Sequence, residues 1–192
     1  MSLPPIVVEA RRRAEATGFV LSSEPDVGTL LACLAASVGA GGRILEIGTG
    51  VGCGLAWLVH GLGARTDVEV VTVDIDDRLQ ARPGAEAWPA YVRFELGDGA
   101  VLVARLGTFD LIFADAPSGK TTGLSGTINA LRSGGTLVVD DMDVTTHNEA
   151  GLRNDLTRVR ERLLGDRRLV CAELAFSSGV VVAVRRWDDA EG

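Results

Sequence analysis

Short apolar runs alternate with amphipathic segments along most of the chain. The runs are rich in Val, Ile, Leu and Phe and end at Gly or Asp, which is typical of strands buried in a parallel sheet. The predicted strands span residues 43–47, 68–76, 91–98, 109–115 and 134–141. Helical spacing of apolar positions predicts helices at 5–17, 25–38, 53–62, 121–132 and 149–164. This alternation predicts a doubly wound α/β fold with right-handed crossovers and helices on both faces of the sheet.

The C-terminal region follows a different pattern. Two β-rich runs, 167–176 and 179–187, are joined by a short turn at 177–179 that contains a glycine. Such a pair predicts an antiparallel hairpin, which extends the sheet to seven mostly parallel strands. At 192 residues, with no linker or internal repeat, the chain is predicted to form a single domain, 1–192.

Composition and charge narrow the classes of function. Hydrophobic residues make up 46% and charged residues 23% of the chain, as in ordinary globular proteins. The formal net charge of −7 argues against nucleic acid as a partner. The basic run Arg11–Arg13 is interpreted as a solvated helix face.

Cysteine usage and the N-terminus bear on location. Cys33, Cys53 and Cys171 lack the spacing of a zinc site and are interpreted as small core residues in a reducing compartment. The N-terminus lacks the pattern of a signal peptide, and no apolar run is long enough to span a membrane. We therefore expect a cytoplasmic protein without a membrane partner.

A glycine-rich loop follows the first predicted strand, with glycines at 48, 50, 52 and 54. Such a loop lets the backbone approach a ligand closely, and the next helix offers free N–H groups. Dinucleotide folds use a similar loop, but here the third glycine position is Cys53, and Glu46 would repel a pyrophosphate. A carboxylate at this place suits a ligand with an ammonium and a sulfonium group, such as S-adenosylmethionine.

Two further acids end predicted strands. Asp74 lies about 20 residues beyond the loop, where an acid can accept both hydroxyls of a ribose. Asp98 ends the third strand and could accept from an adenine amino group. Both also precede helical segments, so the alternative for each is a turn or a helix N-cap.

The motifs together resemble those of class I S-adenosylmethionine-dependent methyltransferases, and more narrowly the catechol-type small-molecule O-methyltransferases. The resemblance covers about residues 22–185 and rests on five stretches: 46–54, 73–76, 96–100, 109–116 and 131–142. It implies a Rossmann-like core at 41–192, with N-terminal helices at 1–40 over the site. It also implies the cofactor-binding residues, which are Val27, Glu46, Gly48, Thr49, Gly50, Gly52, Asp74, Ile75, Asp98, Gly99 and Asp115.

In the resembled family a divalent cation is held by acids that end the fourth and fifth strands. The matching positions are Asp115, Asp140 and Asp141, and all-oxygen ligands favour Mg²⁺. Alternatively, Asp140 or Asp141 caps the next loop and faces solvent. The resemblance makes Asp115 a catalytic residue as well as a ligand.

Two positions depart from the family pattern. The family has Asn where this chain has Asp141, which adds a negative charge. The family's general-base lysine aligns with Ser118, and Lys120 lies two residues further on. Lys120 is therefore predicted as the catalytic base. The alternatives are a surface lysine, and a reaction without a base in which a metal-bound hydroxyl ionises by itself. His147 follows the acidic stretch and is a weaker candidate for the acceptor pocket.

We therefore expect an O-methyltransferase that acts on a hydroxyl of a small acceptor, aromatic or not, with a divalent cation. Methyltransferases that act on bases or amides resemble one another in an Asn/Asp-Pro-Pro-aromatic motif at this strand end. Residues 115–118 have one proline and no aromatic residue, so the missing resemblance argues against such acceptors. Three alternatives stay open: a nicotinamide-dependent oxidoreductase, a cofactor-binding protein without catalysis, and a methyltransferase for an amine or a macromolecule. A homodimer is implied by the resemblance alone.

Overall fold

The protein is described by a computed structural model that covers residues 2–20, 23–79 and 87–187. One seven-stranded sheet forms its centre, in the order β3-β2-β1-β4-β5-β7-β6. The strands are β1 (Arg43–Ile47), β2 (Glu69–Asp74), β3 (Val92–Leu96), β4 (Phe109–Ala114), β5 (Leu131–Val139), β6 (Leu169–Leu174) and β7 (Val180–Arg185). Strands β1 to β5 are parallel, whereas β7 is antiparallel to both β5 and β6. The predicted fold class is confirmed.

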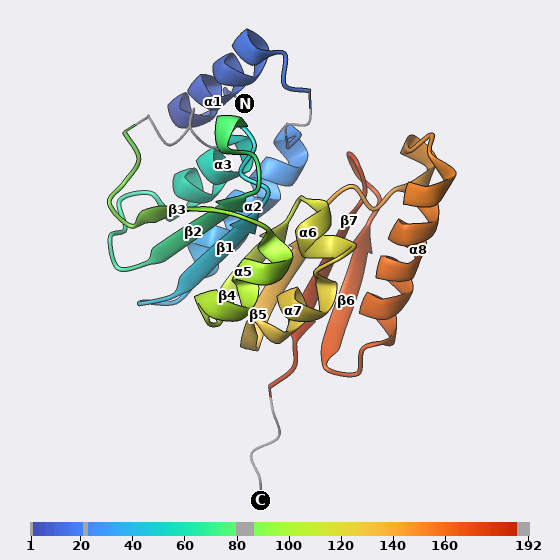
Figure 1. Cartoon of the computed structure of the whole chain (residues 1–192). Helices are drawn as coiled ribbons and strands as arrows, with labels where there is room; N and C mark the ends of the chain where they lie inside the picture. The colour runs from blue at the N-terminus through green and yellow to red at the C-terminus, as the bar shows by residue number, and fades with distance from the viewer. Residues whose placement is uncertain (1, 21–22, 80–86, 188–192) are drawn as a thin grey trace, which may run out of the picture.

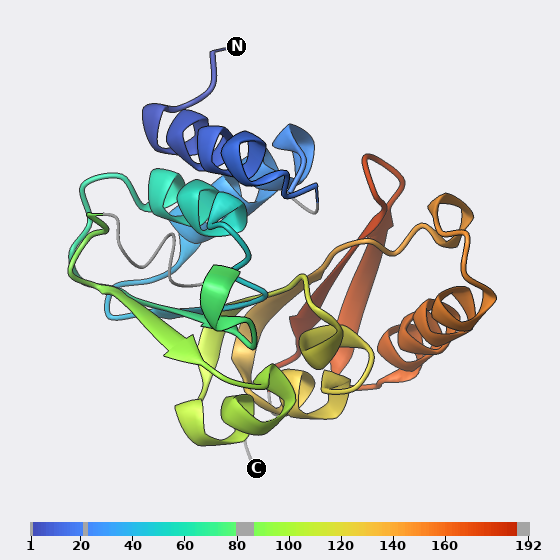
Figure 2. The same ribbon diagram turned by 45° about the horizontal axis from the view of Figure 1, so that its top comes forward.

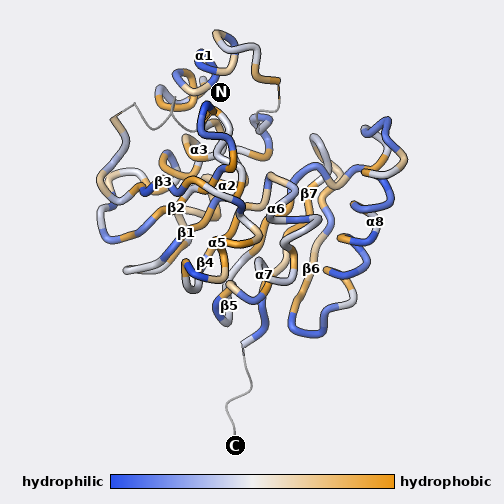
Figure 3. The backbone as a smooth tube through the Cα atoms, viewed as in Figure 1, coloured by the Kyte–Doolittle hydropathy of each residue, from blue (hydrophilic) through white to orange (hydrophobic). Residues whose placement is uncertain are grey.

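Helices cover both faces of this sheet (Figures 1 and 2). They are α1 (Pro5–Thr17), α2 (Pro25–Ser37), α3 (Cys53–Leu62), α5 (Gly99–Leu106), α6 (Pro117–Lys120), α7 (Leu124–Asn129) and α8 (Ala150–Gly165), with a 3₁₀ turn at Val144–Thr146. The first three helices lie over one face, and α5, α7 and α8 lie over the other. Apolar residues are concentrated along the central strands, whereas α8 is largely hydrophilic (Figure 3).

The alternation of side chains along β1 divides the core into two parts. Ile44 packs with the α1–α3 layer, whereas Leu45 and Ile47 pack with the α5–α8 layer, because successive strand residues point to opposite faces. Glu46 points to the same face as Ile44 and is fully buried. The central strand thus places a carboxyl group in an apolar layer, directly before the glycine loop.

The helix predicted at 121–132 is shorter in the structure. Only α7 (Leu124–Asn129) lies within the predicted range, and β5 begins at Leu131 rather than at the predicted residue 134. A bulge explains the early start, because Phe109 pairs with Leu131 but Leu111 pairs with Thr136. Leu131 is fully buried, so pairing and burial override its place in an apparent helical pattern. The strand ends at Val139, and the two following aspartates lie beyond it.

Two smaller predictions were wrong. Arg13 is only 8% exposed, because its guanidinium donates to the carbonyl oxygen of Val51 at 3.1 Å and lies 5.7 Å from the centre of the Trp88 ring. Arg11 and Arg12 are exposed, so the solvated face includes only part of the run. Cys33 is also exposed rather than in the core. Across the described helices, none is both long and apolar enough to cross a bilayer.

Candidate functional site

A cavity of about 510 Å³ opens at the carboxyl edge of the sheet. Ligands of open α/β folds bind at this edge, because the loops that follow parallel strands meet there. The glycine loop and Asp74 line one end of the cavity, and the acids that follow β4 and β5 line the other. One continuous space therefore joins the two groups of residues that the sequence predicted to be functional.

The glycine loop is built by backbone conformations that favour glycine. Gly48 has φ of 109° and Gly50 has φ of 52°. A side chain on Gly50 would also collide with the ring of Phe19, because its Cβ would lie only 2.9 Å from Phe19 Cζ. The N–H groups of Gly48 and Thr49 both donate to the carbonyl oxygen of Val73, at 2.8 and 3.2 Å, which fixes the loop to the end of β2.

Asp74, the last residue of β2, lies at the glycine-loop end of the cavity, which we call the cofactor end because a cofactor is predicted to bind there. Its Oδ2 accepts from the backbone N–H of Gly50 at 2.7 Å, and its Oδ1 accepts from the N–H of Asp76 at 2.9 Å. The residue is therefore a turn acid, and it also lines the cavity. A carboxylate has about four acceptor positions, so these two bonds leave room for ribose hydroxyls. The predicted ribose contact stays a prediction with suitable geometry.

Glu46 lies beneath the loop and does not line the cavity. Thr72 Oγ1 donates to Glu46 Oε2 at 2.5 Å, and the hydroxyls of Thr72 and Thr49 are 2.7 Å apart. No hydrogen-bond partner for Glu46 Oε1 lies within the described residues. Burial raises the pKa of Glu46 to about 8, which favours a neutral carboxyl group at ordinary pH. Its predicted contact with the ammonium group of the cofactor stays a prediction.

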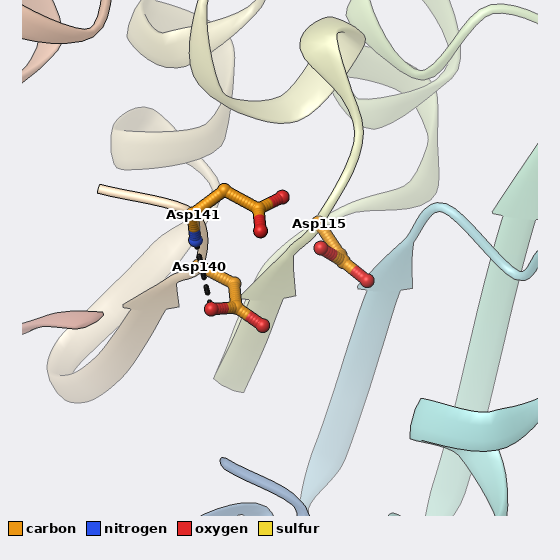
Figure 4. A group of neighbouring side chains, drawn as sticks. All are labelled: Asp115, Asp140 and Asp141. Atoms are coloured by element: carbon orange, nitrogen blue, oxygen red, sulfur yellow. Dashed lines mark hydrogen bonds between the residues drawn. The ribbon is translucent and has the colours of Figure 1, made fainter. Parts of the chain in front are cut away.

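The three aspartates of the predicted metal site converge (Figure 4). Asp115 follows β4, and Asp140 and Asp141 follow β5; each offers one oxygen, and these three atoms lie within 4.8 Å of one another. Two charges about 5 Å apart at an effective dielectric constant near 20 repel by about 3 kcal/mol. Burial and the neighbouring carboxylates raise the pKa values of Asp115 and Asp140 above their usual range. The cluster therefore favours a cation.

Lys120 supplies one positive charge from within the chain. Its side chain comes from α6 and is 5% exposed. The Nζ atom donates to the backbone oxygen of Asp140 and to Oδ2 of Asp141, both at 2.9 Å. The aspartate that departs from the family pattern and the displaced lysine are thus ion-paired with each other. This placement contradicts the alternative that Lys120 is a surface lysine.

The turn of the β6–β7 hairpin adds a contact that the sequence did not reveal. Ser178 donates to Oδ1 of Asp140, which also accepts from the N–H of Asp141 at 2.8 Å. Both bonds fix the carboxylate of Asp140, and this residue is only 3% exposed, so Asp140 does not face solvent. Sequence reasoning predicted this turn but not its neighbour, because the position of β7 beside β5 brings the two together.

Other residues close the walls of the cavity. His147 lines it, and its Nε2 lies 3.1 Å from the backbone oxygen of Asp141. Leu152 and Leu156 of α8 provide an apolar wall, and Phe19 covers the glycine loop from the N-terminal segment. Polar groups at both ends and apolar groups between them are typical of small-molecule sites.

The remaining predicted cofactor residues lie outside the cavity lining. They are Val27, Gly52, Ile75, Asp98 and Gly99. Asp98 caps α5 by accepting from the N–H of Ala100 at 2.9 Å, which is the structural alternative that the sequence left open. Val27 is fully buried and Ile75 is 72% exposed. Their contacts with a cofactor stay predictions.

Similarity to proteins of known description indicates the family to which this chain belongs. The methyltransferase domain family matches this chain over residues 45–142. A Mycobacterium tuberculosis H37Rv protein named as an O-methyltransferase is 35% identical over 193 residues, which cover 94% of this chain and 84% of that protein. A Mycolicibacterium smegmatis protein of the same description is 34% identical and covers 94% and 90%.

Solved structures show the same fold. The O-methyltransferase TomG of Streptomyces achromogenes, in complex with S-adenosylmethionine, has a TM-score of 0.82 at 24% identity, over 96% of this chain and 91% of that one. An O-methyltransferase of Bacillus cereus with S-adenosylhomocysteine has a TM-score of 0.81 at 21% identity, over 97% and 93%. With the family match and the curated relatives, these findings show that the chain belongs to the class I S-adenosylmethionine-dependent O-methyltransferases.

Proposed function

We propose that this methyltransferase acts on a hydroxyl of a small acceptor, with phenols as the first class to test. The observation that carries the proposal is the continuous cavity between the glycine loop and the three aspartates. Its volume of about 510 Å³ lies within the range of small-molecule sites. A macromolecular acceptor is less well supported, since the acidic net charge disfavours nucleic acid.

We further propose that a divalent cation, Mg²⁺ in the first place, binds to Asp115, Asp140 and Asp141. The residues fit such an ion because they offer only carboxylate oxygens, which are the ligands of hard cations. Two of the three also have raised pKa values, caused first by burial, which a nearby cation would oppose. When bound, the ion would lower the pKa of an acceptor hydroxyl.

The chain's own residues would provide the rest of catalysis by positioning. The glycine loop and Asp74 would hold the cofactor at one end, so that its methyl group points along the cavity toward the aspartates. Leu152, Leu156 and Phe19 would exclude water from the space between them. The roles of Asp115 and Lys120 as catalytic residues stay part of this proposal.

Methyl transfer to a panel of phenols and catechols tests the proposal. The purified chain is incubated with labelled S-adenosylmethionine and Mg²⁺, and Asp140→Asn is compared with Asp143→Asn. Asp143 caps the 3₁₀ turn and does not belong to the cluster, so it is a matched control. We expect Asp140→Asn to lose at least about 100-fold in transfer, because charge stabilisation at the reacting centre is lost.

Calorimetry with S-adenosylhomocysteine shows whether the cofactor site of the variant is intact. Equal transfer by Asp140→Asn and the wild type would contradict the metal mechanism. Cofactor binding without transfer to any acceptor would instead favour a binding protein without catalysis. A chain that binds a nicotinamide cofactor in place of S-adenosylhomocysteine would contradict the assignment as a whole.

Two expectations about context belong to the same proposal. A cytoplasmic location rests on the cysteine pattern alone, because three cysteines far apart in sequence suit a reducing compartment. A homodimer rests on the family resemblance alone. Light scattering of the purified chain measures the second, and a monomer at micromolar concentration would contradict it.

A further inference from the structure

Among the Lys and Arg residues of this chain, all but one are arginines. Lys120 is the single lysine among its 19 Lys and Arg residues. It is also buried, whereas lysine is among the residues that are almost never fully buried unless they are paired. An ammonium group is a compact point charge, unlike the planar guanidinium of Arg. The one lysine therefore lies where a small cation is enclosed by acceptors.

The position of Lys120 is fixed by the packing of α6. Gly119 lies against Ile47, and a Cβ on it would come within 3.0 Å of Ile47 Cδ1. Thr127 Oγ1 donates to the Gly119 backbone oxygen at 2.8 Å, which joins α6 to α7. These contacts hold the backbone beside the lysine. The ammonium group therefore reaches the acidic cluster from a backbone segment that is fixed by packing.

The contacts of Lys120 are directed at the two residues that follow β5. Its Nζ lies 2.9 Å from Asp141 Oδ2 and 2.9 Å from the Asp140 backbone oxygen. Asp141 has φ of 59°, a left-handed conformation that is uncommon for a residue other than Gly. The same Asp141 is one of the three residues whose oxygens lie within 4.8 Å of one another. The ion pair with Lys120 and a bond to a metal ion would therefore use the same carboxylate, that of Asp141.

We propose that Lys120 is a tethered counter-cation that neutralises Asp141 when no metal is bound, and that a divalent ion binds in competition with it. This inference rests on the proposed function, because it assumes the metal site at the three aspartates. An entering divalent cation is repelled by the ammonium group. It binds to Asp141 only after the ion pair between Lys120 and Asp141 has broken. Lys120 thereby weakens the metal site and sets the metal concentration at which the site fills.

A lysine-specific signal can follow this exchange directly, because the chain has one lysine. Protein labelled with [¹³Cε]lysine gives a single lysine resonance, which is recorded during titration with Mg²⁺ in the presence of S-adenosylhomocysteine. We expect the resonance to move and to saturate together with metal binding. A resonance that does not move while Mg²⁺ saturates the protein would overturn the proposal.

Mn²⁺ affinity, measured by electron paramagnetic resonance without acceptor, gives the second readout. We expect Lys120→Met to bind Mn²⁺ at least about tenfold more tightly than the wild type, because a repelling charge is removed. In the Asp141→Asn background the same substitution should change the affinity much less, since the shared carboxylate is gone. Equal or weaker binding by Lys120→Met would overturn the proposal.

The design separates this inference from the proposed function. A wild type that binds Mn²⁺, with no gain in Lys120→Met, contradicts the competition alone. A wild type and variants that bind no Mn²⁺ contradict the metal site itself, and the competition with it. Lys120→Gln is the second variant in case Lys120→Met fails to fold, and binding of S-adenosylhomocysteine verifies the fold of each protein.

Discussion

The carboxylates at the two ends of the cavity differ in the kind of hydrogen-bond donor that contacts them. At the cofactor end, Asp74 accepts hydrogen bonds from two backbone N–H groups, which belong to Gly50 and Asp76. At the acidic end, side chains donate as well: Ser178 donates to Asp140, which also accepts from one backbone N–H, and Lys120 donates to Asp141. Backbone donors come with the loop itself, whereas the side-chain donors come from α6 and from the β6–β7 turn.

Under the proposed function, this difference separates an end that holds a fixed ligand from an end that exchanges its cation. Backbone N–H groups cannot leave without unfolding the segments that carry them, so the arrangement around Asp74 is preorganised. A lysine side chain has rotatable bonds and can be replaced by another cation. We therefore expect substitutions at the first end to affect cofactor affinity, and those at the second end to affect metal affinity.

The largest expected effect is a loss of affinity at the cofactor end. Asp74→Ala removes the acceptor of the Gly50 N–H and of the predicted ribose bonds. Hydrogen bonds to a charged group contribute about 1.5–3 kcal/mol, so affinity for S-adenosylhomocysteine should fall by about 3 kcal/mol, or about 100-fold. Calorimetry measures the change, and Asp77→Ala, at an exposed position three residues further on, is the control. An affinity within about twofold of the wild type would exclude Asp74 from the ribose site.

The second prediction concerns the buried carboxyl group beneath the loop. Burial raises the pKa of Glu46 from 4.5 to about 8, so the folded protein holds a proton that the unfolded chain releases in this range. Stability from this group is therefore present at low pH and is lost as the pH rises toward and through 8. Glu46→Gln stays neutral, and should reduce the loss of unfolding free energy between about pH 6 and about pH 9 by about 2 kcal/mol.

Urea unfolding at both pH values measures this effect. Glu149→Gln, at an exposed position before α8, is the control and should keep the wild-type pH dependence. An unchanged pH dependence in Glu46→Gln would mean that the Glu46 carboxyl group is not held neutral.

The smallest expected effect is a modest loss of metal affinity at the acidic end. Ser178→Ala removes one of the two hydrogen bonds to Asp140 Oδ1. One such bond contributes about 1 kcal/mol, so Mn²⁺ affinity should fall by about fivefold while cofactor affinity stays constant. Ser177→Ala is the matched control, since Ser177 contacts Glu24 rather than Asp140. A parallel loss in both variants would point to a general loosening of the turn.

Much of the fold followed from local patterns. The strands at 43–47 and 109–115 were predicted to within a residue, because apolar runs that end at Gly or Asp identify buried parallel strands. The region at 121–132 was mispredicted, because Leu131 pairs with Phe109 across a bulge that no local pattern reveals. Asp98 shows a related limit, since an acid before a helix fits both a cap and a ligand contact.

Local sequence patterns were sufficient to predict the strands of the sheet, the glycine loop and the acids at the strand ends, because each depends on neighbours a few residues away. The partners that balance the charges of the acids became visible only in the folded protein. Lys120 meets Asp141 and Ser178 meets Asp140 because α6 packs on β1 and β7 inserts beside β5. Those contacts join segments that are about 20 to 40 residues apart in sequence, so their energies depend on the folded packing rather than on any local pattern.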